Sequence, residues 1–391
     1  MVRPRLIAAL AVTAIIVGLE VCGCSAPSTH DGGVALADGQ SIAKQPPAAF
    51  QLGIPQEQIP ADAPEAVKQH IRRLYSADAA ERARGARALG YEELGALAIP
   101  FLIDLLGDDT SIGIRLDPPD VNPGYIPTPG KEAARALAEI GEAAFSPLLA
   151  VLNDEDSGGT AMAAYALGAM RARPAVEPLI RALGDGRNEV RAESARALGL
   201  IGDDRAIPAL VQAADDPSVE LRRAAVLALG SFHTPLVVDP LIAALGDEDW
   251  EVAIIASADL GEMNLPGLEK RLIQATEDSR PAVRAGAAWA LRRNESQAAV
   301  TALLALLQDK VSRVTESAAY ALGRTGSFRA VDPLIRALRD GTPRVSNAAA
   351  TALEEICGRH EGLGSSPSAW QQWWTANKAK LLAEDPQVVE E

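Results

Sequence analysis

The sequence has few of the residues on which enzymes and nucleic-acid-binding proteins depend. Among 391 residues there are 3 cysteines and 4 histidines, aromatic residues make up 4%, and the net charge is −15. With so few aromatic residues, a hydrophobic core has to be built from Ala, Leu, Val and Ile. An acidic chain also lacks the basic stripe that displaces counterions from a phosphate backbone, so the composition argues against a nucleic-acid partner.

Motifs for catalysis and metal binding are also missing. There is no HExxH sequence, no paired CxxC sequence and no phosphate-binding Walker loop. The histidines, His30, His70, His233 and His360, are far apart in the sequence. The segment 153–158 is acidic like a calcium loop but lacks the glutamate that closes an EF-hand loop. We therefore expect no catalytic residue, no metal site and no cofactor.

What the sequence does contain is a repeat. The Ala-Leu-Gly triplet at 197–199 recurs along the chain, and the leucines that anchor the copies are 31 residues apart: Leu167, Leu198, Leu229, Leu260, Leu291, Leu322 and Leu353. Two earlier copies, at Leu89 and Leu137, break this spacing. A fixed period of roughly 20 to 50 residues is typical of solenoid proteins.

Each copy has the pattern of two helices. The position four residues before the anchor is always small, as at Gly85 and Ser194, which lets two helix backbones approach closely. The residue before the anchor is alanine in eight of the nine copies, and we expect the exception, Asp259, to turn toward solvent or to be hydrogen-bonded. A second helix such as 178–183 begins near a proline. From Leu167 onward, an aspartate lies thirteen residues before each anchor and marks the turn between repeats. We expect its carboxylate to accept hydrogen bonds from free backbone N–H groups there.

These positions carry a resemblance to a known family. The segment Val190–Gly199, followed by Ala206–Leu210 and Asp215-Asp216, resembles the HEAT repeat, and more narrowly the short HEAT-like repeats of the phycobilisome-lyase type. The resemblance extends over about residues 63–358. It implies an all-α fold, an α-solenoid in the form of a right-handed superhelix of αα-hairpins. It implies little about function, because scaffolds, adaptors and a few enzymes share this repeat.

The N-terminus is typical of an exported lipoprotein. Met1–Arg5 is positively charged, Leu6–Leu19 is an apolar run, and Val21–Cys24 resembles a bacterial lipobox. We expect residues 1–23 to be a signal peptide and Cys24 to carry the lipid. The alternative is an ordinary signal peptide or an uncleaved N-terminal anchor. The protein is then expected at the cell envelope, lipid-anchored to the membrane, on the periplasmic side in a Gram-negative cell.

The rest of the chain divides by composition and by period. Residues 24–60 are rich in Ala, Gly, Gln, Pro and Ser, which predicts a flexible tether. We expect the segments that follow to be an N-terminal capping helix at 61–78, the repeat solenoid at 79–358, a C-terminal cap at 359–384 in which Trp370, Trp373 and Trp374 share one helical face, and an acidic tail at 385–391.

An insertion separates the first two repeats. Leu89 and Leu137 are 48 residues apart, and the extra chain falls in residues 109–130, where prolines and glycines exclude a helix. This segment is either a plain surface loop or a binding loop. The side chains with which it would bind are Arg115, Asp117, Asp120 and Tyr125.

The outward positions of the second helices form two rows. If the second helices line the concave side of the solenoid, these rows present small and mixed-charge residues to a partner: Glu177, Arg181, Gln212, Asp239, Lys270, Gln274, Asp332 and Arg336. A mildly polar trough of this kind is more typical of a protein-binding surface than of a small-molecule pocket. The alternative is that the rows are an ordinary solvated face.

We therefore expect a non-catalytic scaffold or adaptor that binds other proteins and touches the membrane only through its lipid. The alternative is an enzyme with HEAT-like repeats, either bilin-lyase-like or a deoxyhypusine-hydroxylase-like oxidoreductase. The hydroxylase resemblance implies paired irons held by several His-Glu pairs on successive repeats, and only His360-Glu361 matches. Nothing in the sequence specifies a tetrapyrrole pocket for a bilin lyase.

Overall fold

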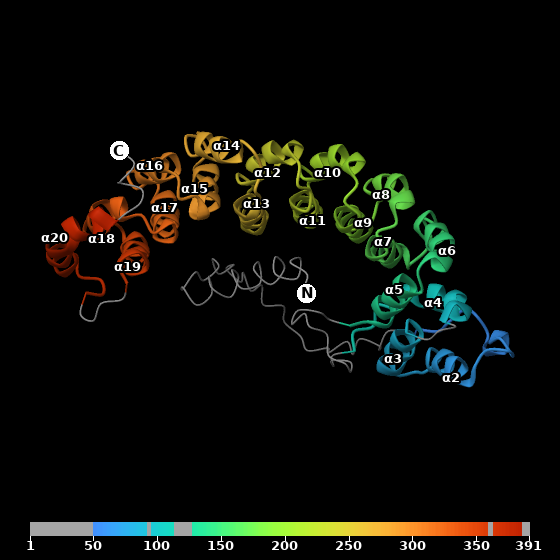
Figure 1. Ribbon diagram of the computed structural model, residues 1–391. Coiled ribbons are helices and arrows are strands. Elements are labelled where there is room, and N and C mark those ends of the chain that lie inside the picture. Colours follow the sequence, from blue (N-terminus) through green and yellow to red (C-terminus); the bar gives the residue numbers. More distant parts are fainter. Residues whose placement is uncertain (1–49, 92–94, 113–126, 359–362, 385–391) are drawn as a thin grey trace, which may run out of the picture. The chain divides into compact units, whose positions relative to one another are not determined.

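The computed structural model describes residues 50–91, 95–112, 127–358 and 363–384. These residues form helices joined by turns, with no strand among them. Residues 51–391 form one compact unit, in which helices alternate between two layers (Figure 1). Stacked helical hairpins of this kind make an α-solenoid, as the sequence predicts. No helix in the described part of the chain is long and apolar enough to cross a membrane.

Each hairpin consists of a first helix, which carries the anchor leucine, and a second helix. The first helices are α3 (Ala79–Leu89), α5 (Pro129–Ile140), α7 (Thr160–Ala169), α9 (Asn188–Ile201), α11 (Val219–Gly230), α13 (Trp250–Glu262), α15 (Pro281–Ala290), α17 (Ser312–Thr325) and α19 (Pro343–Cys357). The second helices are α4 (Ile99–Asp104), α6 (Glu142–Leu152), α8 (Val176–Ala182), α10 (Ile207–Ala213), α12 (Val238–Ala244), α14 (Leu268–Ala275), α16 (Gln297–Leu306) and α18 (Val331–Asp340). Helix α2 (Glu65–Arg73) precedes the array and α20 (Pro367–Glu384) follows it.

Short 3₁₀ turns connect these helices. Most of them lead directly into a second helix, which lets the chain reverse direction within a few residues. They are η1 (Gln56–Gln58), η2 (Gly95–Ala98), η3 (Leu105–Gly107), η4 (Arg173–Ala175), η5 (Asp204–Ala206), η6 (Pro235–Val237), η7 (Leu291–Arg293) and η8 (Phe328–Ala330).

The first helices pack on one another through the small residues of the repeat. Anchors such as Leu198 are fully buried, and the glycine after an anchor faces the alanine before the next one. A Cβ placed on Gly168 would lie 2.6 Å from the Cα of Ala197, and one on Gly199 would lie 2.7 Å from the Cα of Ala228. Because such distances leave no room for a side chain, these glycines set how closely neighbouring first helices approach.

The two layers differ in how tightly their helices pack. Neighbouring first helices contact one another along their lengths, whereas neighbouring second helices touch at few points. Successive hairpins therefore bend toward the first helices, which form the inner layer of this unit. In Figure 1, α7, α9, α11 and α13 lie below α8, α10, α12 and α14. The structure thus places the second helices on the outer side, contrary to the expectation that they line the concave side.

The turns between repeats are closed by aspartates, as the sequence predicts. In five of these turns the carboxylate accepts a hydrogen bond from the backbone N–H two residues further on at 2.8 Å, as seen for Asp185, Asp216, Asp247, Asp278 and Asp309. This geometry ties down an amide that would otherwise be unpaired next to a helix start.

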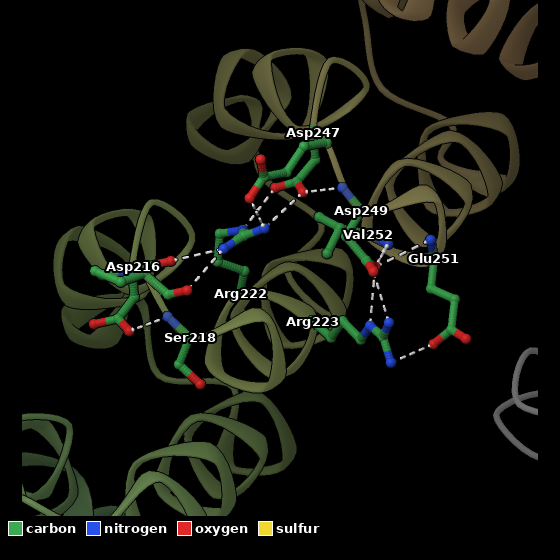
Figure 2. A network of polar contacts seen from close by, with 10 residues as sticks. Asp216, Ser218, Arg222, Arg223, Asp247, Asp249, Glu251 and Val252 are labelled. Atoms are coloured by element: carbon green, nitrogen blue, oxygen red, sulfur yellow. Dashed lines mark hydrogen bonds and ion pairs between the residues drawn. The ribbon is translucent and has the colours of Figure 1, made fainter. Parts of the chain in front are cut away.

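A buried arginine links several of these turns to the first helix before them. Arg222 donates to both carboxylate oxygens of Asp247, at 2.9 and 3.0 Å, and to the backbone oxygens of Asp216 and Pro217 (Figure 2). The pairs Arg191–Asp216 and Arg284–Asp309 in other repeats also join the first helix to the next turn. Where the arginine is replaced, as by Thr160, Ala253 and Thr315, the aspartate of the following turn pairs instead with an arginine of its own turn: Asp185 with Arg187, Asp278 with Arg280, and Asp340 with Arg339.

Helix α20 covers the last hairpin. It packs on α18, and Trp370 and Trp374 are fully buried. Trp374 stacks on Phe328 with a ring-centroid distance of 6.3 Å, and the indole N–H of Trp370 donates to the backbone oxygen of Gly364 at 2.8 Å. The aromatic face predicted from the tryptophan spacing is therefore packed against the repeats.

Described residues that precede α2 contact the first hairpin, although the sequence predicts a flexible tether there. The backbone N–H groups of Gly53 and Ile54 donate to Asp104 of α4, at 2.6 and 3.1 Å. The hydroxyl of Tyr75 donates to the backbone oxygen of Ile54 at 2.7 Å. Gly53 and Ile54 are thus bound by hydrogen bonds to α4 and to Tyr75 after α2, although the sequence assigns them to the tether.

Candidate functional site

The eight side chains predicted to bind a partner lie on the outer layer of second helices. They occupy equivalent outward positions of successive hairpins, and all are exposed except Asp332, which is half-buried. Glu177 and Arg181 lie on α8, Gln212 on α10, Asp239 on α12, Lys270 and Gln274 on α14, and Asp332 and Arg336 on α18. We call this set the outer rows. Their exposure is as predicted, although they lie on the outer side.

Pairing within the chain divides the outer rows into two groups. Each acidic side chain forms an ion pair with a basic neighbour: Glu177 with Arg205, Asp239 with Arg271, and Asp332 with Lys378. Within the described part of the chain, five others make no hydrogen bond or ion pair: Arg181, Gln212, Lys270, Gln274 and Arg336. The outer rows therefore offer positive charge and amide groups to a partner more readily than negative charge.

The inner layer has an exposed face that was not predicted. Leu200 on α9 and Leu227 on α11 are 46% and 45% exposed, and Trp250 at the start of α13 is 44% exposed. These residues belong to helices whose opposite face is fully packed, so the repeat does not require them to be apolar. The sequence does contain a sign of this face. Leu200 lies two residues after the anchor Leu198, and Leu227 lies two residues before the anchor Leu229, so neither leucine is at a packing position of the repeat.

Asp259 lies in the packing seam between α11 and α13. Its carboxyl occupies the space beside Gly230 that alanine methyl groups fill elsewhere, and its Oδ2 atom is buried without a hydrogen-bond partner. Burial, and then the negative charge of Glu262, raise the pKa of Asp259 to about 7. The expectation that this side chain turns outward or is hydrogen-bonded is therefore wrong.

The described residues offer little to catalysis or metal binding. No group of three or more His, Cys, Asp or Glu side chains is placed to hold a metal ion in the part of the chain that the structure describes. Burial raises the pKa of the Cys357 thiol to about 12. Because the thiolate is the reactive form of cysteine, this thiol is a poor nucleophile near neutral pH.

Several predicted residues lie outside the described part of the chain. They are the lipidation residue Cys24, the loop residues Arg115, Asp117, Asp120 and Tyr125, and His360. Their roles stay predictions.

Several solved structures are similar to this chain. The chain is similar to an engineered protein (23% identity, TM-score 0.38, covering 82% of this chain and 94% of that one). It is also similar to human deoxyhypusine hydroxylase in complex with glycerol, with 20% identity and a TM-score of 0.28, over 68% of this chain and 97% of that one. A third similar structure is the CpcE–CpcF complex of phycocyanin lyase from Nostoc, with 23% identity and a TM-score of 0.35, over 63% of this chain and 96% of that one. At these identities and scores the likenesses carry no argument about activity. No curated protein matches the sequence.

Family models match the repeats themselves. The model described as HEAT repeats matches residues 146–230, 176–258 and 238–323. The model described as PBS lyase HEAT-like repeat matches residues 131–154 and 316–340. The matches together run without a gap from 131 to 340, over the hairpins whose helices are described above. The chain is therefore a HEAT-repeat protein.

Proposed function

We propose that this protein is a non-catalytic scaffold that binds other proteins at the cell envelope. The observation that carries the proposal is the outer rows. Arg181, Gln212, Gln274 and Arg336 are exposed at equivalent positions of separate hairpins and make no hydrogen bond or ion pair within the described chain. A surface of equivalent, evenly spaced polar groups suits an extended partner, because each repeat adds one similar contact.

The same proposal places the protein on a membrane through a lipid on Cys24. Replacing Cys24 with serine removes the sulfur that would carry the lipid, so Cys24→Ser is expected to lose membrane association in fractionated cells. Cys22→Ser is the matched control, because Cys22 would leave with the signal peptide. If the Cys24→Ser protein stays with the membrane after a salt wash while Cys22→Ser behaves as the unaltered protein, another segment anchors the chain.

An enzyme with HEAT-like repeats is the second candidate. The match of residues 131–154 and 316–340 to the PBS lyase HEAT-like repeat supports it, since that repeat takes its name from a lyase. The two candidates differ in what the purified protein contains. A scaffold is expected to carry no stoichiometric iron and no bound pigment by metal analysis and absorption spectroscopy. Either one, present at one or more per chain, would favour the enzyme.

A further inference from the structure

We propose that the exposed face of α9, α11 and α13 on the inner layer binds a basic, amphipathic segment of a partner protein. The inference deepens the scaffold function and rests on it, because it names the chemistry of one partner segment. It concerns a different layer from the outer rows, so the two surfaces can be tested separately.

The centre of this face is apolar. Gly199 and Ala228 are in close contact across the seam between α9 and α11. Leu200 follows Gly199 and Leu227 precedes Ala228, so the two leucines lie next to each other on the solvent side of that contact. Both are nearly half exposed. Two adjacent exposed leucines among polar residues on the solvent side of α9 and α11 make a small apolar patch that a partner can cover.

Acidic side chains lie on the same helices as this patch. Glu189, Glu220 and Glu251 occupy equivalent positions in the first turns of α9, α11 and α13. Glu193 and Asp249 are mostly covered, with 19% and 16% of their side chains exposed. Two arginines, Arg196 and Arg223, lie one helical turn before the leucines. Both arginines are already engaged, Arg196 with Glu193 at 2.7 Å and Arg223 with Asp249 and Glu251 at 2.7 and 2.6 Å. Acids therefore outnumber bases on the face, and Glu189 and Glu220 are exposed.

Charge and apolar area together select the partner. A segment with apolar side chains on one side would cover Leu200 and Leu227, and its lysines or arginines would meet the glutamates in the first turns of the same helices. An acidic segment or a nucleic acid would be repelled. The net charge of −15 for the whole chain acts in the same direction, since it draws a basic partner toward the protein at low salt.

The neighbouring hairpins do not share this chemistry. At positions equivalent to Leu200 stand Arg293, in η7 after α15, and Arg324 on α17, and Arg313 on α17 stands at the position of Glu189. A basic segment is therefore expected to bind over α9 to α13 and to stop short of α15.

The test uses the full chain and a synthetic probe. The probe is an 18-residue helical peptide of leucine and lysine with its leucines on one face, and the control peptide has the same composition in scrambled order. Binding is measured by calorimetry at two salt concentrations. We expect the amphipathic peptide to bind at least tenfold more tightly than the scrambled one, and to bind more weakly at high salt. Leu200→Gln with Leu227→Gln is expected to weaken binding at least tenfold.

A matched control keeps the test specific. Leu236 is 64% exposed and lies in the turn η6, away from the proposed face, so Leu236→Gln should leave binding unchanged. Circular dichroism should show the same helical content in all variants. The proposal is overturned if the amphipathic peptide does not bind, if it binds no better than the scrambled one, or if the double variant binds as well as Leu236→Gln. None of these outcomes concerns the outer rows, which lie on the other layer. The scaffold function is tested separately, by partner capture on the outer rows.

Discussion

Replacing Asp259 with alanine is expected to raise the free energy of unfolding by about 2–4 kcal/mol at pH 8. Burial raises the pKa of this carboxyl to about 7, and at pH 8 the folded state holds a buried carboxylate whose Oδ2 atom has no partner. Alanine is the residue found at this position in the other eight copies of the repeat, so the variant restores the packing seen elsewhere.

The sign of the pH dependence follows from the direction of the shift. An unfolded aspartate loses its proton near pH 4, whereas Asp259 in the folded protein keeps it until about pH 7. Between these values the folded state binds more protons than the unfolded state, so stability falls as pH rises from about 4 to 7 and then levels off. The gain from Asp259→Ala should therefore be small at pH 5 and full at pH 8.

Urea denaturation at pH 5 and pH 8 measures this difference. Asp204→Ala, at an exposed aspartate of the turn η5, serves as the control and should change neither value. An equal gain at both pH values, or a loss at pH 8, would show that Asp259 is not charged and buried in the seam.

Replacing Arg222 with threonine is expected to destabilise the protein by about 2–4 kcal/mol. The change leaves the carboxylate of Asp247 without its main partner in a site where both side chains are at most 10% exposed. Threonine is the natural alternative at this position, since Thr160 and Thr315 donate to carbonyls of the preceding turn there. In those repeats, however, a local arginine pairs with the following aspartate, and the turn between α12 and α13, which holds Asp247, has none.

Arg223→Thr is the matched control on the same helix. Arg223 pairs with Asp249 and Glu251 at the surface (Figure 2) and is 36% exposed, so its loss should cost no more than about 1 kcal/mol. Thermal and urea denaturation compare the two variants. Equal effects would mean that the buried arginines contribute no more to stability than surface ion pairs do.

The fold could be predicted because the repeat fixes residue size at each position. Anchor leucines and the small residues four before them lie in the buried seams, and so does the alanine one before the anchor in the repeats after the first. The helix spacing of these positions determines which face of each helix is packed. One 31-residue repeat is therefore enough to predict the packed faces of its two helices.

The order of the layers was not predicted from the same pattern. Hydrophobic spacing shows which face of a helix is buried, but both layers of a hairpin array have a buried face and an exposed one. The deciding feature is the contact of Gly168 with Ala197 and of Gly199 with Ala228, which draws the first helices together. Both residues of each contact are visible in the sequence, but their proximity depends on how neighbouring repeats stack.

The environment of Asp259 also depends on the neighbouring repeat. A lone aspartate at an alanine position is compatible with an outward rotamer, a hydrogen bond or burial, and only the position of Gly230 on α11 separates these possibilities. The exposed leucines at 200 and 227 were missed for a related reason. Their positions are unconstrained by the repeat, so their apolar character was not distinguished from that of the core.

Partner capture on the outer rows tests the scaffold function most directly. A photo-crosslinking amino acid at Gln212 or Gln274, in cells expressing the full chain, should trap a defined partner protein, because both side chains are exposed and make no hydrogen bond within the described chain. Arg181→Glu with Arg336→Glu should reduce the captured amount several-fold at low salt, less so at high ionic strength because salt screens these contacts, and leave the helical content unchanged. Deletion of residues 113–126 provides the comparison. Undiminished capture in the double arginine variant, together with loss of capture in the deletion, would show that the insertion binds the partner and the outer rows do not.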